Sequence, residues 1–343
     1  MALHKKPDFF IVGAPKCGTT ALNHYLAAHP DIFMAKKETH FFGTDLRFGP
    51  HYQLYRKYQD EYWAQFEAWN GQARAGEASV WYLFSQRAAA EIKAFNPDAR
   101  IIIMLREPAA MLYSLYCQFL ADGNEYLPTF KEALAAEEDR RAGRRLGRRT
   151  YLDQALVYRD TACFSQQVRR FFDVFGRERV QVIIYDDFSA DTANVYRQTL
   201  DFLGVAPNGA ATKFEVINGN VNGNYSVRSP ALRAVLNDPW VRGAAVALRG
   251  WLPRGIFTVV RNTGLALNAL NFVNAPTKRR PIDLELEDSL RREFAPEIER
   301  LSALLGRDLT HWSQRKAILP QAENLSTIQE RESVLSRSGL ETA

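Results

Sequence analysis

A short segment near the N-terminus, residues 9–22, constrains the fold of this chain more than any other. It reads FFIVGAPKCGTTAL. Four apolar residues typical of a buried strand precede a loop of small residues, and apolar residues then recur at helical spacing as far as His29 and Pro30. The pattern predicts a strand, a phosphate-binding loop and a helix. Because the first N–H groups of a helix lack intrahelical partners and the helix dipole is positive there, this turn suits an anion, and Lys16 adds a full charge.

The position of the lysine distinguishes this loop from the nucleotide-binding P-loop. Gly13 and Gly18 have the Walker A spacing, but that motif ends in Gly-Lys-Ser/Thr. Here Lys16 lies inside the loop and Thr19 follows the second glycine. A Mg-nucleotide site is therefore disfavoured, and a glycine-rich turn that binds no ligand is the alternative at this point.

The form Gly-x-Pro-Lys-x-Gly-Thr-Thr after an N-terminal strand resembles the 5'-phosphosulfate loop of sulfotransferases. These enzymes use 3'-phosphoadenosine 5'-phosphosulfate (PAPS), and the likeness is greatest to the heparan sulfate sulfotransferases and their bacterial relatives. The resemblance implies PAPS as donor and PAP as product, with Lys16 also acting in catalysis. It implies that the donor is held by five consecutive residues, Lys16, Cys17, Gly18, Thr19 and Thr20.

A second segment, residues 36–42, carries the sequence KKETHFF. Composition alone fits a solvated turn followed by core phenylalanines. The pattern Glu-x-His-Phe-Phe behind the phosphate loop nevertheless resembles the family segment that supplies the catalytic base. The resemblance implies that Glu38 is the general base and that His40 is its polar neighbour in the site.

A third segment lies at the end of a continuous apolar strand, residues 99–105. The strand suits the middle of a parallel sheet and ends in Arg106, and a helix over 109–121 places Ser114 eight residues further on. In open α/β sheets both side chains would lie near the ligand-binding crevice. The pair resembles the family's 3'-phosphate segment. A Walker B strand would instead end in an aspartate that manages magnesium.

Residues 76–83 resemble the family segment near the acceptor, with two departures. Ala78 stands where several glycan sulfotransferases carry a lysine, and Val80 replaces the usual proline. Any role of that lysine is therefore absent, or it is supplied by Lys36 or Lys37.

Several other stretches admit more than one interpretation. A run of six arginines over 140–149 is interrupted by glycines and predicts a mobile loop or frayed helix, either as solvated surface or as a landing site for an anionic acceptor. It lacks the interleaved aromatic residues typical of nucleic-acid binding. Asp186 and Asp187 after a strand over 180–185 are expected in a surface loop without metal. The loop over 218–230 resembles one that closes over the donor, with Arg228 as a contact.

Periodicity predicts helices over 52–69, 85–95, 153–175 and 191–203. Residues 290–312 resemble the family's usual C-terminal helix and end. The segment 240–273 is apolar but carries four arginines, so it cannot span a bilayer and predicts a pair of helices packed on the domain. Residues 320–343 lack an apolar stripe and predict a disordered tail.

Composition bounds the remaining possibilities. The chain has 343 residues, 46% of them hydrophobic, and a net charge of +5, which suits a phosphorylated donor. The three cysteines are far apart and indicate neither a disulfide framework nor a zinc site. Cys17 lies at a helix start, where a thiol pKa can fall, although this position requires only a small side chain. With no signal peptide or membrane anchor at the N-terminus, we expect a cytoplasmic enzyme.

Together these observations predict one α/β domain over residues 8–312, with a mostly parallel sheet and helices on both faces. The resemblance implies a PAPS-dependent sulfotransferase that needs no metal and acts on a glycan or a small-molecule acceptor, with no nucleic-acid partner and no membrane span. A P-loop kinase and a non-catalytic nucleotide- or glycan-binding module are the alternatives.

Overall fold

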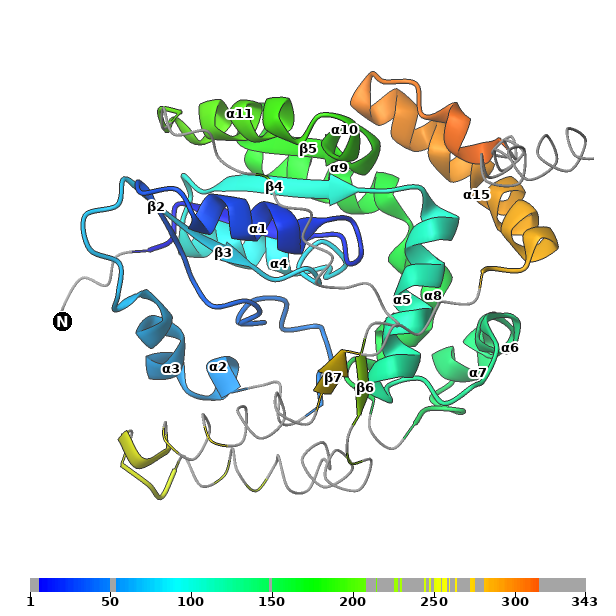
Figure 1. The fold of residues 1–343 in the computed structure, drawn as a ribbon, viewed down its shortest axis with the longest axis horizontal. Coiled ribbons are helices and arrows are strands. Elements are labelled where there is room, and N and C mark those ends of the chain that lie inside the picture. The colour runs from blue at the N-terminus through cyan, green and yellow to red at the C-terminus, as the bar shows by residue number, and fades with distance from the viewer. Residues whose placement is uncertain are drawn as a thin grey trace, which may run out of the picture.

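A wholly parallel five-stranded sheet lies at the centre of the molecule, in the order β2-β3-β1-β4-β5 (Figure 1). The computed structural model describes residues 6–49, 54–147, 150–207 and 281–314, with short pieces between 214 and 274. The strands are β1 (Phe9–Gly13), β2 (Ile32–Met34), β3 (Arg74–Ala78), β4 (Arg100–Leu105) and β5 (Val180–Ile184). Because β1 is central, the loop that follows it emerges between its neighbours.

The two innermost predicted strands are confirmed. Every residue of β1 is buried, and so is every residue of β4 after Arg100. Such continuous apolar runs are typical of parallel strands that are covered on both faces. The register pairs Phe9 with Gly76 of β3 on one side and with Arg100 of β4 on the other.

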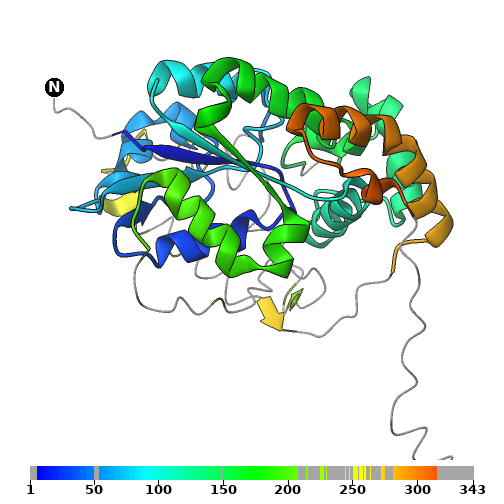
Figure 2. The ribbon, with the colours of Figure 1, turned by 90° about the horizontal axis from the view of Figure 1, so that it is seen from above.

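Helices cover both faces of the sheet, as predicted (Figure 2). One face carries α1 (Thr19–Ala27), α10 (Tyr185–Ala190) and α11 (Thr192–Leu203), and the other carries α4 (Ala88–Phe95), α9 (Phe164–Phe175) and α15 (Leu284–Leu305). Tyr25 of α1 packs 6.2 Å from the ring of Phe188 in α10, and the Tyr196 hydroxyl of α11 donates to the Tyr25 carbonyl at 3.3 Å. These contacts make one layer of the three helices.

Helix α5 (Pro108–Asp122) continues directly from β4. The Glu107 side chain accepts a hydrogen bond from the Ala110 N–H at 3.0 Å, and Pro108 occupies the first turn, so the start is well capped. Gly123 ends the helix in a left-handed conformation. Short helices follow, namely α6 (Phe130–Ala135), α7 (Glu137–Arg141), η3 (Asp153–Leu156) and α8 (Tyr158–Thr161).

Two long predicted helices are wrong in extent. The range 52–69 contains α2 (Leu54–Lys57), α3 (Gln59–Trp63) and η2 (Ala64–Phe66), because Tyr58 is extended and interrupts the helix. The range 153–175 contains η3, α8 and α9, because Val157 and Cys163 leave the helical conformation. Apolar spacing alone does not reveal such breaks.

The C-terminal helix also differs from its predicted range of 290–312. α15 begins at Leu284 and ends at Leu305, where Gly306 is left-handed, and a separate turn, η5 (Thr310–Ser313), follows. A short 3₁₀ turn, η4 (Arg177–Arg179), directly precedes β5.

The region between 214 and 274 is described in part. A short antiparallel pair joins β6 (Tyr225–Val227) to β7 (Phe272–Asn274), so the predicted loop over 218–230 includes a strand. Arg228, most of the predicted helix pair over 240–273 and the predicted tail over 320–343 lie outside the described residues. Among the helices that are described, each is too short or too polar to cross a membrane.

Candidate active site

The predicted anion-binding loop lies at the carboxyl ends of β1 and β4. The Ala14 N–H donates to the Met104 carbonyl at 2.7 Å, which fixes the loop to β4. Gly18 caps α1 with φ of 92°, and a Cβ there would lie 3.1 Å from the Tyr185 ring. Conformation and space therefore both require glycine. Since Gly18 has no side chain to cap the helix, the first turn of α1 is suited to an anion.

Arg106 lies beside this loop. Its guanidinium carbon is 4.7 Å from the centre of the Tyr185 ring, the same ring that packs on Gly18. A cation over an aromatic face is held in place without losing its charge. The fold thus brings the end of β4 and the loop after β1 to one place, as expected at the carboxyl edge of a parallel sheet.

Ser114 lies in the second turn of α5 and is 6% exposed. Ser114 thus lies on α5, the helix that directly follows β4 and Arg106. Arg228, the remaining predicted donor contact, cannot be placed because it lies outside the described residues.

The Cys17 thiol is buried inside the loop. Its sulfur donates to the Pro15 carbonyl at 3.4 Å, and burial raises its pKa to about 12, although Arg106 and Lys16 act in the opposite direction. Desolvation of the thiol thus raises its pKa more than the positive charges around the helix start lower it. The thiol therefore stays protonated at neutral pH. This environment favours the interpretation of Cys17 as a small packing residue.

Lys37 connects the loop to the second predicted segment. Its Nζ donates to the hydroxyl oxygens of Thr19 at 3.0 Å and Thr20 at 3.1 Å. The same Nζ lies 3.7 Å from Glu38 Oε1. Lys36, by contrast, is exposed. Of the two lysines that the sequence left open, Lys37 is the one placed at the start of α1.

Glu38 lies opposite the loop with its side chain 22% exposed. Burial raises the pKa of its carboxyl, while the Lys37 ammonium and a backbone hydrogen bond from Val80 oppose the rise. A partly accessible carboxylate with a raised pKa has the properties of a general base. Its Oε2 lies 3.5 Å from His40 Nε2.

His40 is buried and stacks on Phe48, with ring centres 4.4 Å apart. Its Nε2 shares a hydrogen bond with the Tyr151 hydroxyl, and its buried Nδ1 has no hydrogen-bond partner among the described residues. Burial, together with the charges of Arg56 and Lys37, lowers the pKa of His40 to about 3. The imidazole is therefore neutral at physiological pH and can orient groups without carrying charge.

Sequence reasoning missed Tyr151. It lies 111 residues from His40 along the chain, and its position depends on pairing between two loops. Phe48 forms an antiparallel bridge with Leu152, and the Gly49 N–H donates to the Tyr151 carbonyl at 3.0 Å. Nothing in the local sequence signals this pairing.

Glu77 carries a buried carboxylate behind the site, in the segment 76–83, and the sequence predicts no role for it. It is fully buried in β3, and burial raises its pKa while its hydroxyl donors oppose the rise. Tyr62 donates to it at 2.8 Å. The other three hydroxyl donors belong to Thr39, Ser79 and Tyr82.

Two of those hydroxyls in turn accept backbone N–H groups from the segment after Glu38. Ser79 Oγ accepts from Thr39 at 3.1 Å and from His40 at 3.2 Å, and the Tyr82 oxygen accepts from Phe41 at 2.9 Å. The Glu77 network thereby fastens the base-bearing segment to β3.

Arg56 of α2 holds the same segment from the other side. Its guanidinium donates to four backbone carbonyls, at distances of 2.6 to 2.9 Å, those of His40, Phe42, Gly43 and Leu46. Its carbon also lies 5.1 Å from the centre of the Phe48 ring. One side chain thus organises the loop that carries His40.

The arginine run is less available than the sequence predicts. Arg140 is fully buried and pairs with Glu125 at 2.8 Å, so for this residue a surface role is wrong. Arg141 pairs with Asp160, and Arg144 with Asp139, both at 2.7 Å. Residues 148–149 lie outside the described part of the chain. Internal acidic partners reduce the field that these arginines can offer to an acceptor.

Asp186 and Asp187 lie in α10 instead of a surface loop. Asp187 pairs with Arg307, and Asp186 accepts from the Trp312 indole at 2.6 Å. Their role is to hold the C-terminal end of the described chain. Within residues 6–314, as far as they are described, no three His, Cys, Asp or Glu side chains are grouped to hold a metal ion.

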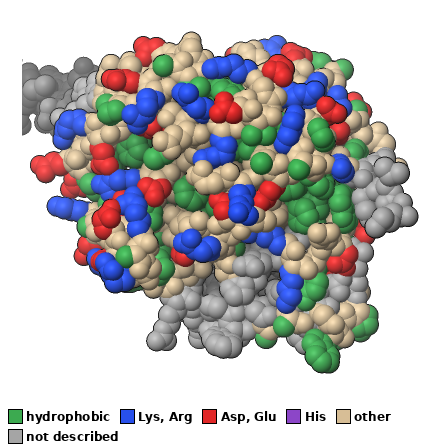
Figure 3. Space-filling view, turned by 180° about the vertical axis from the view of Figure 1, so that it is seen from behind, with side chains coloured by type: hydrophobic (Ala, Val, Ile, Leu, Met, Phe, Trp, Pro, Cys, Tyr) green, Lys and Arg blue, Asp and Glu red, His purple; other side chains and the backbone are tan. Residues whose placement is uncertain are grey.

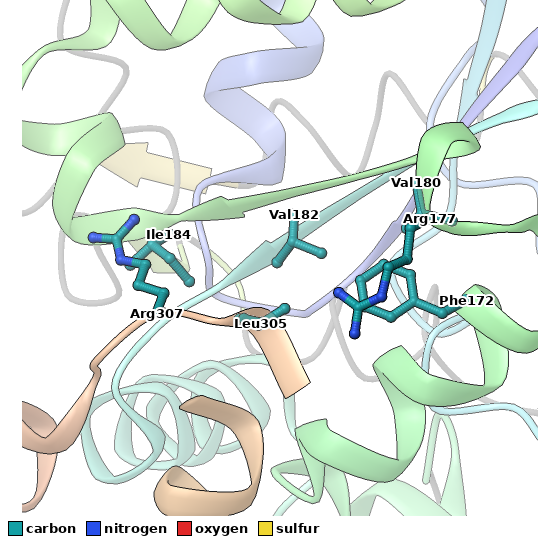
Figure 4. A pocket seen from close by; sticks show the side chains of 7 residues that line it. All are labelled: Phe172, Arg177, Val180, Val182, Ile184, Leu305 and Arg307. Carbon is teal, nitrogen blue, oxygen red and sulfur yellow. The ribbon is translucent and has the colours of Figure 1, made fainter. Parts of the chain in front are cut away.

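A pocket of about 240 Å³ lies on another part of the sheet, between β5, α9 and the end of α15 (Figure 4). It contains none of the predicted site residues. Arg177 at its rim lies 4.6 Å from the Phe172 ring and donates to the Leu304 carbonyl at 2.7 Å. Arg177 is thus engaged in packing the helices together, and Arg307, which also lines the pocket, pairs with Asp187.

The fold defines a P-loop-like α/β protein whose strand-to-helix loop after β1 lies near the Glu38 carboxyl through Lys37. The chain belongs to the sulfotransferase family, whose sequence model matches residues 7–208. A crystal structure of a sulfotransferase from Alicyclobacillus acidocaldarius is 31% identical and superimposes with a TM-score of 0.63, covering 90% of this chain and 100% of that one.

Curated relatives point the same way. Carbohydrate sulfotransferase 15 of Rattus norvegicus is 26% identical over 59% of this chain and 44% of its own length. Human heparan sulfate glucosamine 3-O-sulfotransferase 5 is 31% identical over 35% of this chain and 32% of its own. The chain thus spans less than half the length of these relatives.

Proposed function

We propose that this protein transfers a sulfuryl group from PAPS to a hydroxyl or amine of a carbohydrate. The observation that carries the proposal is the bridge made by Lys37, which contacts Thr19 and Thr20 and lies 3.7 Å from Glu38. The Lys37 ammonium thus lies between the start of α1, which would bind the anion, and Glu38, which would act as the base. Membership of the sulfotransferase family and relatives named for carbohydrate and heparan sulfate substrates support the same reaction.

The loop would stabilise the leaving group. Transfer breaks the bond between sulfur and the phosphate oxygen, so negative charge grows on the 5'-phosphate. Lys37 and the N–H groups at the start of α1 would neutralise such charge, and Lys16 of the same loop would add a second cation. Fixed donors of this kind cost no reorganisation during the reaction.

Arg106 and Ser114 would hold the 3'-phosphate of the donor, and Arg228 would add a contact. Arg106 is presented on the Tyr185 ring beside the loop. A second phosphate site distinguishes this donor from ATP and AMP. The kinase alternative is weakened because the loop lacks the Walker lysine and β4 is followed by a cation.

Glu38 would accept the proton of the acceptor as the new bond to sulfur forms. A positioned base contributes about 10² to 10⁴ in rate. His40, neutral and hydrogen-bonded to Tyr151, would orient the base or the acceptor.

Two measurements test the proposal. Calorimetry should show much tighter binding of adenosine 3',5'-bisphosphate than of AMP, and labelled PAPS should transfer sulfate to at least one member of a carbohydrate panel. Equal affinity for the two nucleotides would contradict the donor assignment. Binding of the bisphosphate without turnover on any acceptor would favour the non-catalytic module.

We also propose that the reaction requires no metal ion and that the protein is cytoplasmic. Transfer should be unchanged by EDTA, and cell fractionation should recover the protein in the cytoplasm. Loss of activity in EDTA that magnesium restores would contradict the first, and recovery outside the cytoplasm would contradict the second.

A further inference from the structure

Tyr151 lies where it can decide which nitrogen of His40 carries the imidazole proton. Its hydroxyl shares a hydrogen bond with His40 Nε2. The same Nε2 lies 3.5 Å from Glu38 Oε2, so one ring nitrogen faces both a phenol and the carboxylate of the proposed base. A neutral imidazole has a single N–H. The position of that proton therefore determines whether His40 can donate a hydrogen bond to Glu38.

Contacts that do not involve the hydroxyl hold Tyr151 in place. Its backbone N–H donates to Asn124 Oδ1 at 2.8 Å, and its carbonyl accepts from the Gly49 N–H at 3.0 Å. Its ring centre lies 5.2 Å from that of Phe48, which also stacks on His40. The hydroxyl is thus presented to Nε2 by a loop that does not depend on it, and Tyr151→Phe should keep this loop in place.

The surroundings of His40 indicate the tautomer. The ring is 4% exposed, and with a pKa of about 3 it is neutral and has one proton to place. Nδ1 lacks a hydrogen-bond partner among the described residues in either tautomer, so the choice is decided at Nε2. At 3.5 Å the Glu38 carboxylate is too far to accept from Nε2, whereas the Tyr151 hydroxyl is hydrogen-bonded to it. A phenol is a better donor than acceptor, and an imidazole lone pair is a good acceptor.

We propose that Tyr151 is a positioning residue whose hydroxyl donates a hydrogen bond to His40 Nε2 and thereby keeps the imidazole proton on Nδ1. Nε2 then has no proton to offer to Glu38. A hydrogen bond donated to a carboxylate favours its charged form and weakens it as a base, so withholding that bond keeps Glu38 basic. The catalytic consequence rests on the proposed function, whereas the arrangement of protons does not.

Other charged groups also act on these two residues. Burial raises the pKa of Glu38, Lys37 at 3.7 Å lowers it, and the buried Glu77 raises it. Burial, Arg56 and Lys37 all lower the pKa of His40. On the face of the molecule seen from behind, basic and acidic side chains are interspersed, so their fields largely cancel at a distance (Figure 3). Removal of the phenol hydroxyl changes none of these groups, and the pKa of Glu38 then reports on the imidazole.

NMR of the full chain with ¹⁵N-labelled histidine tests the tautomer. The chain has six histidines, and the signals of His40 are those lost in His40→Asn. Protonated and unprotonated ring nitrogens have well-separated ¹⁵N shifts. At neutral pH Nδ1 should give the protonated shift and Nε2 the unprotonated one. A protonated Nε2 in the parent protein would overturn the proposal.

Titration of the Glu38 carboxyl, followed by ¹³C NMR and assigned with Glu38→Gln, measures the consequence. In Tyr151→Phe the imidazole proton can move to Nε2 and be donated to Glu38. The titration should therefore shift to lower pH, and the acid limb of kcat should shift with it. Tyr126→Phe is the matched control, because Tyr126 is 51% exposed, and it should titrate as the parent does. An unshifted titration in Tyr151→Phe, or an equal shift in both variants, would contradict the proposal.

The His40→Asn background shows whether the shift passes through the imidazole. There Tyr151→Phe should leave the titration of Glu38 unchanged, since no imidazole remains to carry the proton, and a shift in this background would also overturn the proposal. Far-UV circular dichroism should show every variant folded. A protein that gives the expected NMR results but transfers no sulfate would contradict the proposed function and support this arrangement of protons.

Discussion

Lys37 shows how a single side chain can unite segments that are recognised separately in the sequence. Its ammonium donates to the hydroxyls of Thr19 and Thr20 at the start of α1 and lies beside Glu38. Burial lowers its pKa, and the Glu38 carboxylate opposes this change. Several glycan sulfotransferases carry a lysine at the position of Ala78, and Lys37 is our candidate for supplying that positive charge in this chain.

We expect Lys37→Ala to reduce turnover by about 10² or more, because a fixed donor to developing charge is lost. Lys36→Ala is the matched control: Lys36 is exposed, and its removal should leave kcat within a factor of about two. Steady-state sulfate transfer measures both. Similar rates for the two variants would show that Lys37 does not act on the transferring group.

The pH dependence of turnover should identify the base. Because burial raises the Glu38 pKa above 4.5, the carboxyl is protonated at higher pH than an ordinary glutamate, and activity should fall as the pH drops through that raised value. His40, with a pKa of about 3, should contribute no limb near 6.5. Glu38→Gln should lose about 10² to 10⁴ in kcat.

His40→Asn separates these two groups. If Glu38 is the base, the acid limb should stay in place in this variant, whatever its rate. A limb that vanishes with His40, or a Glu38→Gln enzyme that keeps normal turnover and bisphosphate binding, would assign the proton transfer elsewhere.

At the scale of elements, the site depends on a join between β3 and the segment after Glu38. Glu77 accepts four hydroxyls, and two of these hold backbone N–H groups of that segment. We expect Glu77→Gln to destabilise the fold by about 1–3 kcal/mol, because the amide NH₂ cannot accept from buried hydroxyls. Urea unfolding followed by far-UV circular dichroism measures the change.

Glu138→Gln is the control for this experiment. Glu138 is 86% exposed, and its surface pair with Arg141 should contribute at most about 1 kcal/mol. If Glu77→Gln is no less stable than this control, the buried network is not required to hold the segment.

Elements with a strong local signal were predictable. β1 and β4 follow from continuous apolar runs, and α1 follows from its spacing and its stop at His29 and Pro30. The helix breaks at Tyr58 and Val157 were not predictable, because apolar residues keep a helical spacing through them while the backbone leaves the helical conformation. Tertiary packing decides such positions, and a single sequence does not show it.

The candidate site divides in the same way. The loop residues and Arg106 follow strands and are predicted from local pattern, whereas Glu38 is predicted only from the resemblance of its segment to the family. Tyr151, and Thr39 and Tyr62 as donors to Glu77, depend on contacts between distant segments, so no local pattern could identify them.

At the scale of the whole molecule, the C-terminal end of the described chain is tied back to α10. The Trp312 indole donates to Asp186, and Trp312 is 3% exposed. We expect Trp312→Ala to cost about 3–5 kcal/mol through lost burial and the cavity left behind. His311→Ala, whose parent side chain is 54% exposed, should cost less than about 1 kcal/mol. Thermal unfolding of both variants would test this, and equal melting temperatures would contradict it.

Arg56 grips the loop after the base entirely through main-chain oxygens, from His40 to Leu46. These hydrogen bonds do not depend on the side chains of the residues whose carbonyls Arg56 contacts. Variation along residues 41–45 is therefore limited by the burial of Phe42 and by the left-handed backbone of Gly43, and not by Arg56.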